Sequence, residues 1–168
     1  MGGGAAKNKQ GFTIIEVVLV LAIAGLIFLM VFIALPALQR GQRDTERRQD
    51  LARAAAAIDA CIGLNPGSTT CKSSVLSSTS ASRIPDDEFK DPTTGQRYTL
   101  VSGGQIYGIY NNDTQDIGNV YMDSDGYCDG DRPVDAPINR SGSPKYVIAM
   151  KLESGGTVCI SNATASDY

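Results

Sequence analysis

Four closely spaced aspartates are the first candidates for chemistry in this sequence. Asp123, Asp125, Asp129 and Asp131 lie within nine residues, with two glycines among them. Carboxylate oxygens are preferred ligands of Ca²⁺, and glycine permits the tight turn that a calcium loop needs. We therefore expect these four side chains to be candidate calcium ligands, although the residue order differs from an EF-hand loop. The alternative is an acidic turn that faces solvent, and no other cofactor is expected.

The four cysteines are the second candidate group. None of them has the Cys-x-x-Cys spacing that zinc sites and redox sites use. An even number of cysteines in a small domain beyond an apolar segment indicates two disulfides. Three pairings are possible, and we favour Cys61–Cys71 together with Cys128–Cys159 over the others. The alternative is that the cysteines are buried free thiols.

The chain of 168 residues contains no histidine and no tryptophan. Without histidine, the chain lacks the usual general base near neutral pH, and Ser–His or Cys–His nucleophile pairs within the chain are excluded. The nucleotide-binding pattern G-x-x-x-x-G-K-[ST] is also missing. We expect no enzymatic activity. A membrane-anchored enzyme is the alternative from another class, and hydrolase activity of the head would indicate it.

One carboxylate, that of Glu16, stands near the start of the apolar run from Phe12 to Leu38. The stretch from Val17 to Leu35 has nineteen residues without a charge, which is long enough to cross a bilayer as a helix. A carboxylate inside a membrane helix costs about 2.5–3.5 kcal/mol on insertion scales. We therefore expect Glu16 to have a partner that compensates for this cost. The alternative is a structural Glu16 that points into the lipid headgroups.

Charge is distributed unevenly around this run. The chain has a net charge of −3, whereas residues 54–168 combine eight Lys and Arg with fourteen Asp and Glu, a net charge of −6. An acidic region repels a phosphate backbone, so we expect no nucleic-acid binding by this part of the chain. Lys7 and Lys9 precede the run and four arginines follow it closely, which on charge alone would place the C-terminal side in the cytoplasm. The cysteines argue for the opposite side.

Helical signals continue beyond the apolar run. Residues 39–62 are rich in good helix formers, and Asp44 and Arg48 stand four residues apart. An apolar stripe at helical spacing comprises Leu51, Ala55, Ile58 and Ile62. We expect one helix from residue 12 to residue 62, on the order of 75 Å long. Gly25 and Pro36 are its expected weak points, because proline removes a backbone donor and should kink or open the helix.

Strand signals follow in two pairs. Residues 97–101 and 105–110 flank Ser102-Gly103-Gly104, and residues 145–152 and 157–160 flank Ser154-Gly155-Gly156. Both pairs predict β-hairpins with glycine turns. A small antiparallel sheet that packs on the Leu51–Ile62 stripe would bury one face of each hairpin. The predicted fold class is therefore α+β.

The run Gly11-Phe12-Thr13-Ile14-Ile15-Glu16, with basic residues before it and the apolar stretch after it, closely resembles the N-terminus of type IV pilins and pseudopilins. The resemblance covers Lys7 to Gln39, and Gly25 matches a glycine that is common in the family. Pro36 departs from the pattern, because the helix-breaking proline of the family usually lies a few residues earlier. The α+β architecture of a long helix and a small sheet is also that of the family.

The resemblance implies specific roles at the N-terminus. A membrane prepilin peptidase would cut between Gly11 and Phe12 on the cytoplasmic side, and Phe12 would become an N-methylated N-terminus. Phe12 and Glu16 would serve filament assembly, because the family glutamate is thought to meet the N-terminal ammonium of a neighbouring subunit. The head would lie outside the cytoplasm, first on a single-pass membrane precursor and then on an extracellular pilus.

The implied function is that of a structural subunit of a type IV pilus used for adhesion and twitching motility. Its partners would be identical copies in a helical filament, the membrane before assembly, prepilin peptidase, and an assembly ATPase with its membrane platform. The alternative is a pseudopilin of a type II secretion or DNA-uptake apparatus, which shares the N-terminus.

The expected organisation has five segments. They are a leader (1–11), a transmembrane and filament-core helix (12–38), an amphipathic continuation of the helix (39–63), a Ser/Thr-rich connecting loop (64–96) and an antiparallel β-sheet head with a C-terminal disulfide region (97–168).

Overall fold

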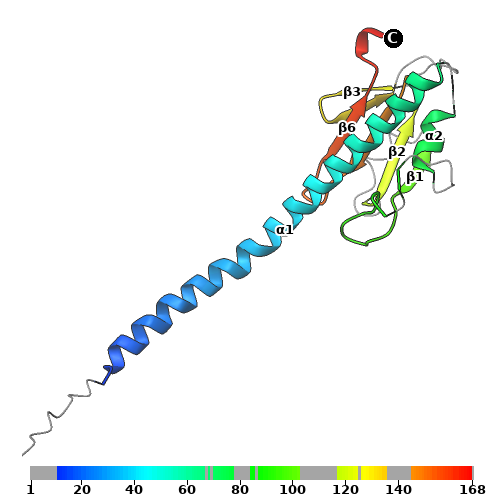
Figure 1. Ribbon diagram of the computed structural model, residues 1–168. Coiled ribbons are helices and arrows are strands. Elements are labelled where there is room, and N and C mark those ends of the chain that lie inside the picture. Colours follow the sequence, from blue (N-terminus) through cyan, green and yellow to red (C-terminus); the bar gives the residue numbers. More distant parts are fainter. Residues whose placement is uncertain are drawn as a thin grey trace, which may run out of the picture. The chain divides into compact units, whose positions relative to one another are not determined.

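The structure is a computed structural model of the whole chain (Figure 1). It describes residues 11–66, 68, 70–77, 84–85, 87–102, 117–124, 126–135 and 145–167. The chain divides into two compact units, Met1–Gln39 and Arg40–Tyr168, and the second of these is the head of the structure. The helix α1 (Ile14–Leu64) contributes to both units.

Helix α1 has 51 residues, as the apolar run and its helical continuation predict. Helix α1 is continuous through Gly25 and Pro36, the two residues at which the sequence predicts a kink or a local opening. Proline removes only one backbone donor, and the good helix formers on either side, including Leu35 and Ala37, keep the flanking turns helical. A break at these positions in an assembled filament stays a prediction.

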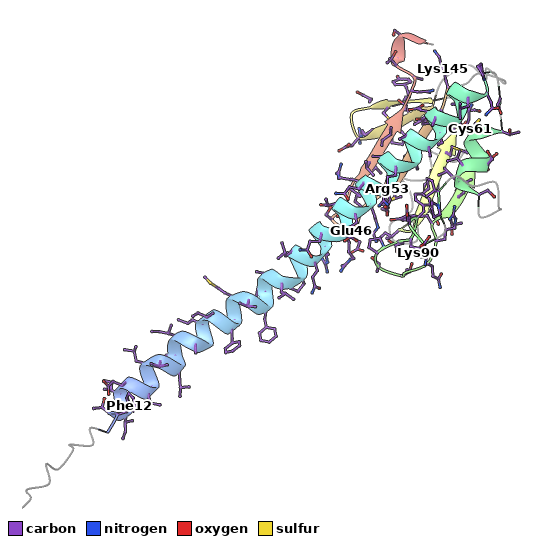
Figure 2. All side chains as sticks on the ribbon, in the orientation of Figure 1. Phe12, Glu46, Arg53, Cys61, Lys90 and Lys145 are labelled. Carbon is purple, nitrogen blue, oxygen red and sulfur yellow. A yellow bond between two sulfur atoms is a disulfide. The ribbon has the colours of Figure 1, made fainter. Side chains whose placement is uncertain are left out.

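The first unit contains the N-terminal half of α1, whose apolar side chains are exposed around the helix (Figure 2). Phe12 is 89% exposed and Phe32 is 76% exposed. Within the described residues, α1 is long and apolar enough to cross a membrane, and its most apolar window has a mean hydropathy of 3.2. This half therefore has an apolar surface that the described chain leaves uncovered.

The second unit contains a four-stranded sheet in the order β1-β2-β5-β6. The strands are β1 (Thr99–Ser102), β2 (Asn119–Asp123), β5 (Val147–Lys151) and β6 (Thr157–Ser161). β1 and β2 pair in parallel, whereas the other pairs are antiparallel. The predicted antiparallel pairing is therefore confirmed for β2, β5 and β6, whereas β1 departs from it. A parallel pair needs a longer connection than the tight hairpin turn that the sequence predicts after β1. The expected second arm of the first hairpin, residues 105–110, lies outside the described residues.

The second predicted hairpin is confirmed. β5 and β6 pair in register from Val147–Ser161 to Lys151–Thr157. The turn between them uses Gly155 and Gly156 at φ values of +88° and +91°, which side-chain-bearing residues rarely adopt. This turn fixes the positions of Glu153 and Ser154 at one end of the head.

The two faces of the sheet have different covers. Alternate residues such as Val120, Ile148 and Val158 join the main core together with Leu51 and Ile58 of α1, so the predicted helical stripe is confirmed. The opposite face presents Tyr121, Val147 and Ala149. A second, two-stranded sheet of β3 (Gly126–Asp129) and β4 (Arg132–Asp135) supplies part of the cover over this face.

Gly126 shows how closely the β3–β4 hairpin and β5 approach each other. A Cβ added at Gly126 would lie 2.6 Å from a methyl carbon of Val147 and 2.9 Å from the carbonyl oxygen of Val134. Both distances are well below normal contact. The absence of a side chain at Gly126 is therefore a packing requirement of this layer.

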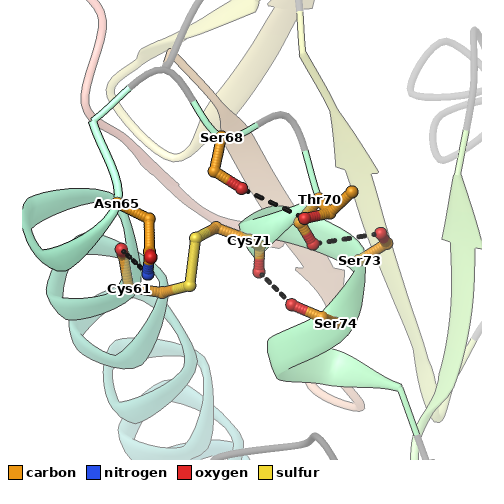
Figure 3. Close-up of a disulfide and its surroundings, with 7 residues drawn as sticks. All are labelled: Cys61, Asn65, Ser68, Thr70, Cys71, Ser73 and Ser74. Atoms are coloured by element: carbon orange, nitrogen blue, oxygen red, sulfur yellow. Dashed lines mark hydrogen bonds between the residues drawn. A yellow bond between two sulfur atoms is a disulfide. The ribbon is translucent and has the colours of Figure 1, made fainter.

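Both predicted disulfides are present. Cys61–Cys71 joins the last turns of α1 to the short helix α2 (Cys71–Leu76), and hydrogen bonds from Asn65 and Ser74 to carbonyl oxygens accompany it (Figure 3). Cys128–Cys159 joins β3 to β6. A short 3-10 helix, η1 (Ala165–Asp167), follows β6. The two cross-links hold peripheral elements of the head to α1 and to the main sheet.

Candidate functional site

Thr13 and Glu16 form a reciprocal hydrogen-bonded pair at the start of α1. The backbone N–H and the hydroxyl of Thr13 both donate to Oε2 of Glu16 at 2.8 Å. The backbone N–H of Glu16 lies 3.4 Å from the Thr13 hydroxyl oxygen, which accepts its hydrogen bond. This is the arrangement of a capping box, in which residues three apart satisfy the free N–H groups of a helix start. The carboxylate that stands out in the sequence therefore has a partner within its own chain.

A shallow apolar groove lies beside this carboxylate. Its lining consists of Phe12, Glu16, Val17, Val20 and Leu21. The spacing of three to four residues places these side chains on neighbouring lines of one helix face. Glu16 is the only charged residue among them. The groove therefore combines apolar surface with one negative charge at the helix start.

The expected cleavage bond, between Gly11 and Phe12, precedes the first helical residue. Gly11, Phe12 and Thr13 are exposed and lie outside helix and strand. A Cβ added at Gly11 would meet no atom within 4 Å. The fold of the described chain therefore does not require glycine at this position. The rest of the predicted leader, residues 1–10, lies outside the described residues.

A second group of charged side chains lies in the head, where α1 passes the turn after β5. Arg47 is completely buried. Its guanidinium donates to Oδ1 of Asp91 at 2.9 and 2.5 Å and to Oε1 of Glu153 at 2.8 Å. It also donates to Asp44 at 3.2 Å and to the Thr93 hydroxyl at 2.6 Å. We call Arg47, Asp44, Asp91 and Glu153, together with Arg43, the Arg47 network.

The remaining bonds close this network. Arg43 donates to Oε2 of Glu153 at 2.6 Å, and the backbone N–H groups of Glu153 and Ser154 donate to Asp44 at 2.8 and 2.9 Å. The Arg43 hydrogen bond lowers the pKa of Glu153 to about 2, against the opposing effect of burial. Burial alone would raise the pKa of Asp44, but its hydrogen bonds from Ser154, Glu153 and Arg47 hold that pKa below its usual value. The carboxylates of Glu153 and Asp44 are therefore kept ionised.

A neighbouring contact attaches the segment before β1 to the same helix. The buried hydroxyl of Tyr98 donates to Oδ2 of Asp50 at 2.9 Å, and Arg53 pairs with the other oxygen of Asp50. Burial raises the pKa of the Tyr98 hydroxyl, and the nearby Asp50 charge raises it further. Phe89 packs against the Tyr98 ring at a centroid distance of 4.8 Å. Together with the Arg47 network, this contact fixes residues 89–98 to α1.

No strong sequence signal predicts the Arg47 network. Two of its members, Asp91 and Glu153, stand 44 and 106 residues away from Arg47 along the chain. The spacing of Asp44 and Arg48 suggests a pair, but Asp44 bonds to Arg47, and Arg48 lies 3.7 Å from Asp131. The available hint was that Asp44 and Arg47 continue, towards the N-terminus, the helical spacing of the apolar stripe that begins at Leu51.

Of the candidate calcium ligands, Asp123 ends β2, Asp129 ends β3 and Asp131 directly precedes β4. The described residues contain no group of three or more acidic, histidine or cysteine side chains placed to hold a metal. Asp123 accepts the backbone N–H of Ser124, and Asp131 lies beside Arg48. Asp129 is exposed at the hairpin turn, and Asp125 lies outside the described residues. Calcium binding by this segment stays a prediction.

The fold and the helix start together define a class of protein. A long N-terminal helix carries an uncovered apolar half, and its second half packs on a small mixed sheet stapled by two disulfides. The fold is α+β and pilin-like.

The family comparison agrees with this class. Residues 6–32 match the family model described as the prokaryotic N-terminal methylation motif. The chain thus carries the N-terminal motif of type IV pilin-like and pseudopilin precursors, a family of structural proteins. The match lies in the N-terminal segment and does not include the head. Comparisons with curated proteins and with solved structures gave no match.

Proposed function

We propose that this chain is the structural subunit of a type IV pilus, a surface filament used for adhesion and twitching motility. The observation that carries this proposal is the uncovered apolar surface of Phe12 and of α1 from Ile14 to Leu38. Apolar surface of this extent is stable in lipid or against similar surfaces, and not in water. The membrane covers it in the precursor, and the same helices of identical copies cover it in the filament.

Processing supplies the charge that assembly needs. Prepilin peptidase cuts between Gly11 and Phe12, and Phe12 is then methylated on its new N-terminal nitrogen. Because a Cβ at Gly11 would meet no atom of the described chain, the requirement for glycine belongs to the peptidase pocket. The new ammonium of one subunit pairs with Glu16 of the next, which offsets the cost of a carboxylate in an apolar filament core.

The head suits the extracellular side. Two disulfides form and persist in oxidising environments, which supports export of residues 40–168. Since the sequence lacks the nucleotide-binding pattern G-x-x-x-x-G-K-[ST], we assign the work of membrane extraction to a separate ATPase and membrane platform. The head itself is not an enzyme in this proposal.

One experiment tests the proposal. Filaments sheared from cells are imaged by electron microscopy, and mass spectrometry identifies the subunit and its mature N-terminus. We expect abundant long filaments whose subunit begins at methylated Phe12. A mature, methylated subunit without surface filaments would instead indicate a pseudopilin, which shares the motif.

A matched variant tests the role of Glu16. Glu16→Ala should leave the precursor inserted and cleaved but abolish ordered filaments. Normal filaments from this variant would contradict the proposed pairing.

A further inference from the structure

Only one oxygen of the Glu16 carboxylate is engaged by its own chain. Both hydrogen bonds from Thr13 end on Oε2. No described contact of the lone chain engages Oε1. A carboxylate has about four acceptor positions, so the bonds to Thr13 leave room for a charged donor from outside.

The two bonds also restrict how the carboxylate is oriented. A free glutamate side chain samples many rotamers, and fixing it in one costs free energy when a partner binds. The Thr13 hydroxyl and N–H hold Glu16 folded back over the first turn of α1. The ordering therefore takes place within the subunit, before any partner arrives.

The surroundings of Glu16 favour one kind of partner. Glu16 lies at a groove whose other lining residues, Phe12, Val17, Val20 and Leu21, are apolar. An apolar helix with a single positive charge at its start matches this groove in its apolar character and in its charge. A second processed copy of this chain, with its ammonium at Phe12, has these properties.

We propose that Thr13 is a positioning residue for assembly: it holds Oε2 of Glu16 so that Oε1 is presented to the N-terminal ammonium of a second copy. This inference rests on the proposed filament function and deepens it. The intrachain cap and the intersubunit ion pair coexist on one carboxylate. Thr13 acts before the subunits meet, by lowering the ordering cost of their contact.

The test compares three threonine variants of the full-length chain in cells that process and assemble it. Thr13→Val removes the hydroxyl with little change in shape, whereas Thr13→Ser keeps it. Thr45→Val is the matched control, because the Thr45 hydroxyl also bonds within α1, to the carbonyl of Gly41 at 2.8 Å, but far from Glu16 in the sequence. Filament yield is measured relative to the amount of mature, membrane-inserted subunit.

We expect Thr13→Val to lower this ratio by about three- to tenfold, the range given by the ordering cost of one side chain. Thr13→Ser and Thr45→Val should both retain the wild-type ratio. A wild-type ratio for Thr13→Val, or an equal defect in Thr13→Ser, overturns the inference. A fall in the amount of mature subunit that matches the fall in filaments also overturns it, because it would indicate a structural role only.

Glu16→Ala separates this inference from the function on which it rests. If Glu16→Ala abolishes filaments and Thr13→Val assembles normally, the positioning role of Thr13 fails and the pairing of Glu16 stands. If Glu16→Ala assembles normally, both fail together.

Discussion

Replacing Arg47 by methionine should destabilise the head more than any other single charge removal in α1. Methionine keeps much of the apolar stem but removes the cation that Asp44, Asp91 and Glu153 share. Glu153 would keep its pair with Arg43, and Asp44 would keep two backbone N–H donors. Asp91 is only 1% exposed and would keep the N–H of Thr94 at 3.2 Å. The main cost therefore falls on Asp91.

The magnitude follows from this unpaired charge. Removing one partner of a buried ion pair costs about 3–5 kcal/mol, because the other charge stays buried without compensation. With a urea dependence of roughly 1–3 kcal/mol per M, the unfolding midpoint of the head should fall by about 2 M. The double variant that adds Asp91→Asn to Arg47→Met removes the unpaired charge. It should recover part of the lost free energy of unfolding.

Urea unfolding of the full chain in detergent micelles measures this effect. The chain has no tryptophan, so near-ultraviolet circular dichroism of the buried tyrosines Tyr98, Tyr121 and Tyr146 reports on the head. Arg48→Met is the control, because Arg48 is half exposed and its pair with Asp131 at 3.7 Å should contribute less than about 1 kcal/mol. A midpoint for Arg47→Met that equals the Arg48→Met midpoint would refute the reasoning. A double variant no more stable than Arg47→Met would refute the assignment to Asp91.

Three further predictions concern the head. Glu153 has its pKa lowered to about 2 from an ordinary 4.5, so its ionised form stabilises the head above the ordinary pKa, and this contribution is lost as the pH falls towards 2. Urea midpoints measured across this range should therefore depend less on pH in Glu153→Gln. Gly126→Ala should cost about 1–3 kcal/mol through overpacking, whereas Gly41→Ala, in open space on α1, should be neutral or stabilising, as thermal unfolding would show. Replacing both cysteines of a bridge by serine should lower the free energy of unfolding, as measured by urea unfolding. The expected loss is roughly 4 kcal/mol for Cys128–Cys159, whose cysteines stand 31 residues apart, and roughly 3 kcal/mol for Cys61–Cys71, whose cysteines stand 10 apart.

Each of these predictions has an outcome that contradicts it. An unchanged pH profile in Glu153→Gln would mean that other carboxylates govern the acid response. Equal stabilities of Gly126→Ala and Gly41→Ala would mean that the β3–β4 hairpin shifts at no cost. A larger loss of stability from removal of the Cys61–Cys71 bridge would show that loop length does not decide which bridge contributes more.

The local features of the fold followed from local sequence signals. The glycine turn before Thr157 predicts the β5–β6 hairpin because positive φ values favour glycine. The cysteine spacings favour the observed pairing because each bridge closes a separate region. The motif around Glu16 is likewise contained in a short segment, so one stretch of sequence carries it.

The missed features depend on residues distant in the chain. Asp91 and Glu153 become neighbours of Arg47 only when two distant segments, one at Asp91 and one in the turn after β5, pack beside α1. No local pattern encodes that approach. The parallel pairing of β1 with β2 depends on the connection between them rather than on either strand. Gly126 reads as a turn residue in the sequence, yet it serves the close approach of β5.

The complete pairing of the cysteines has a practical consequence for mapping subunit contacts. All four cysteines of the chain are in disulfides, so the native protein offers no free thiol. A single cysteine introduced at an exposed position of α1, such as Ala56, would be the one reactive thiol of each subunit. Spin labels or thiol cross-linkers at successive positions along this exposed side would then report the separation of neighbouring copies, because no native thiol would be labelled.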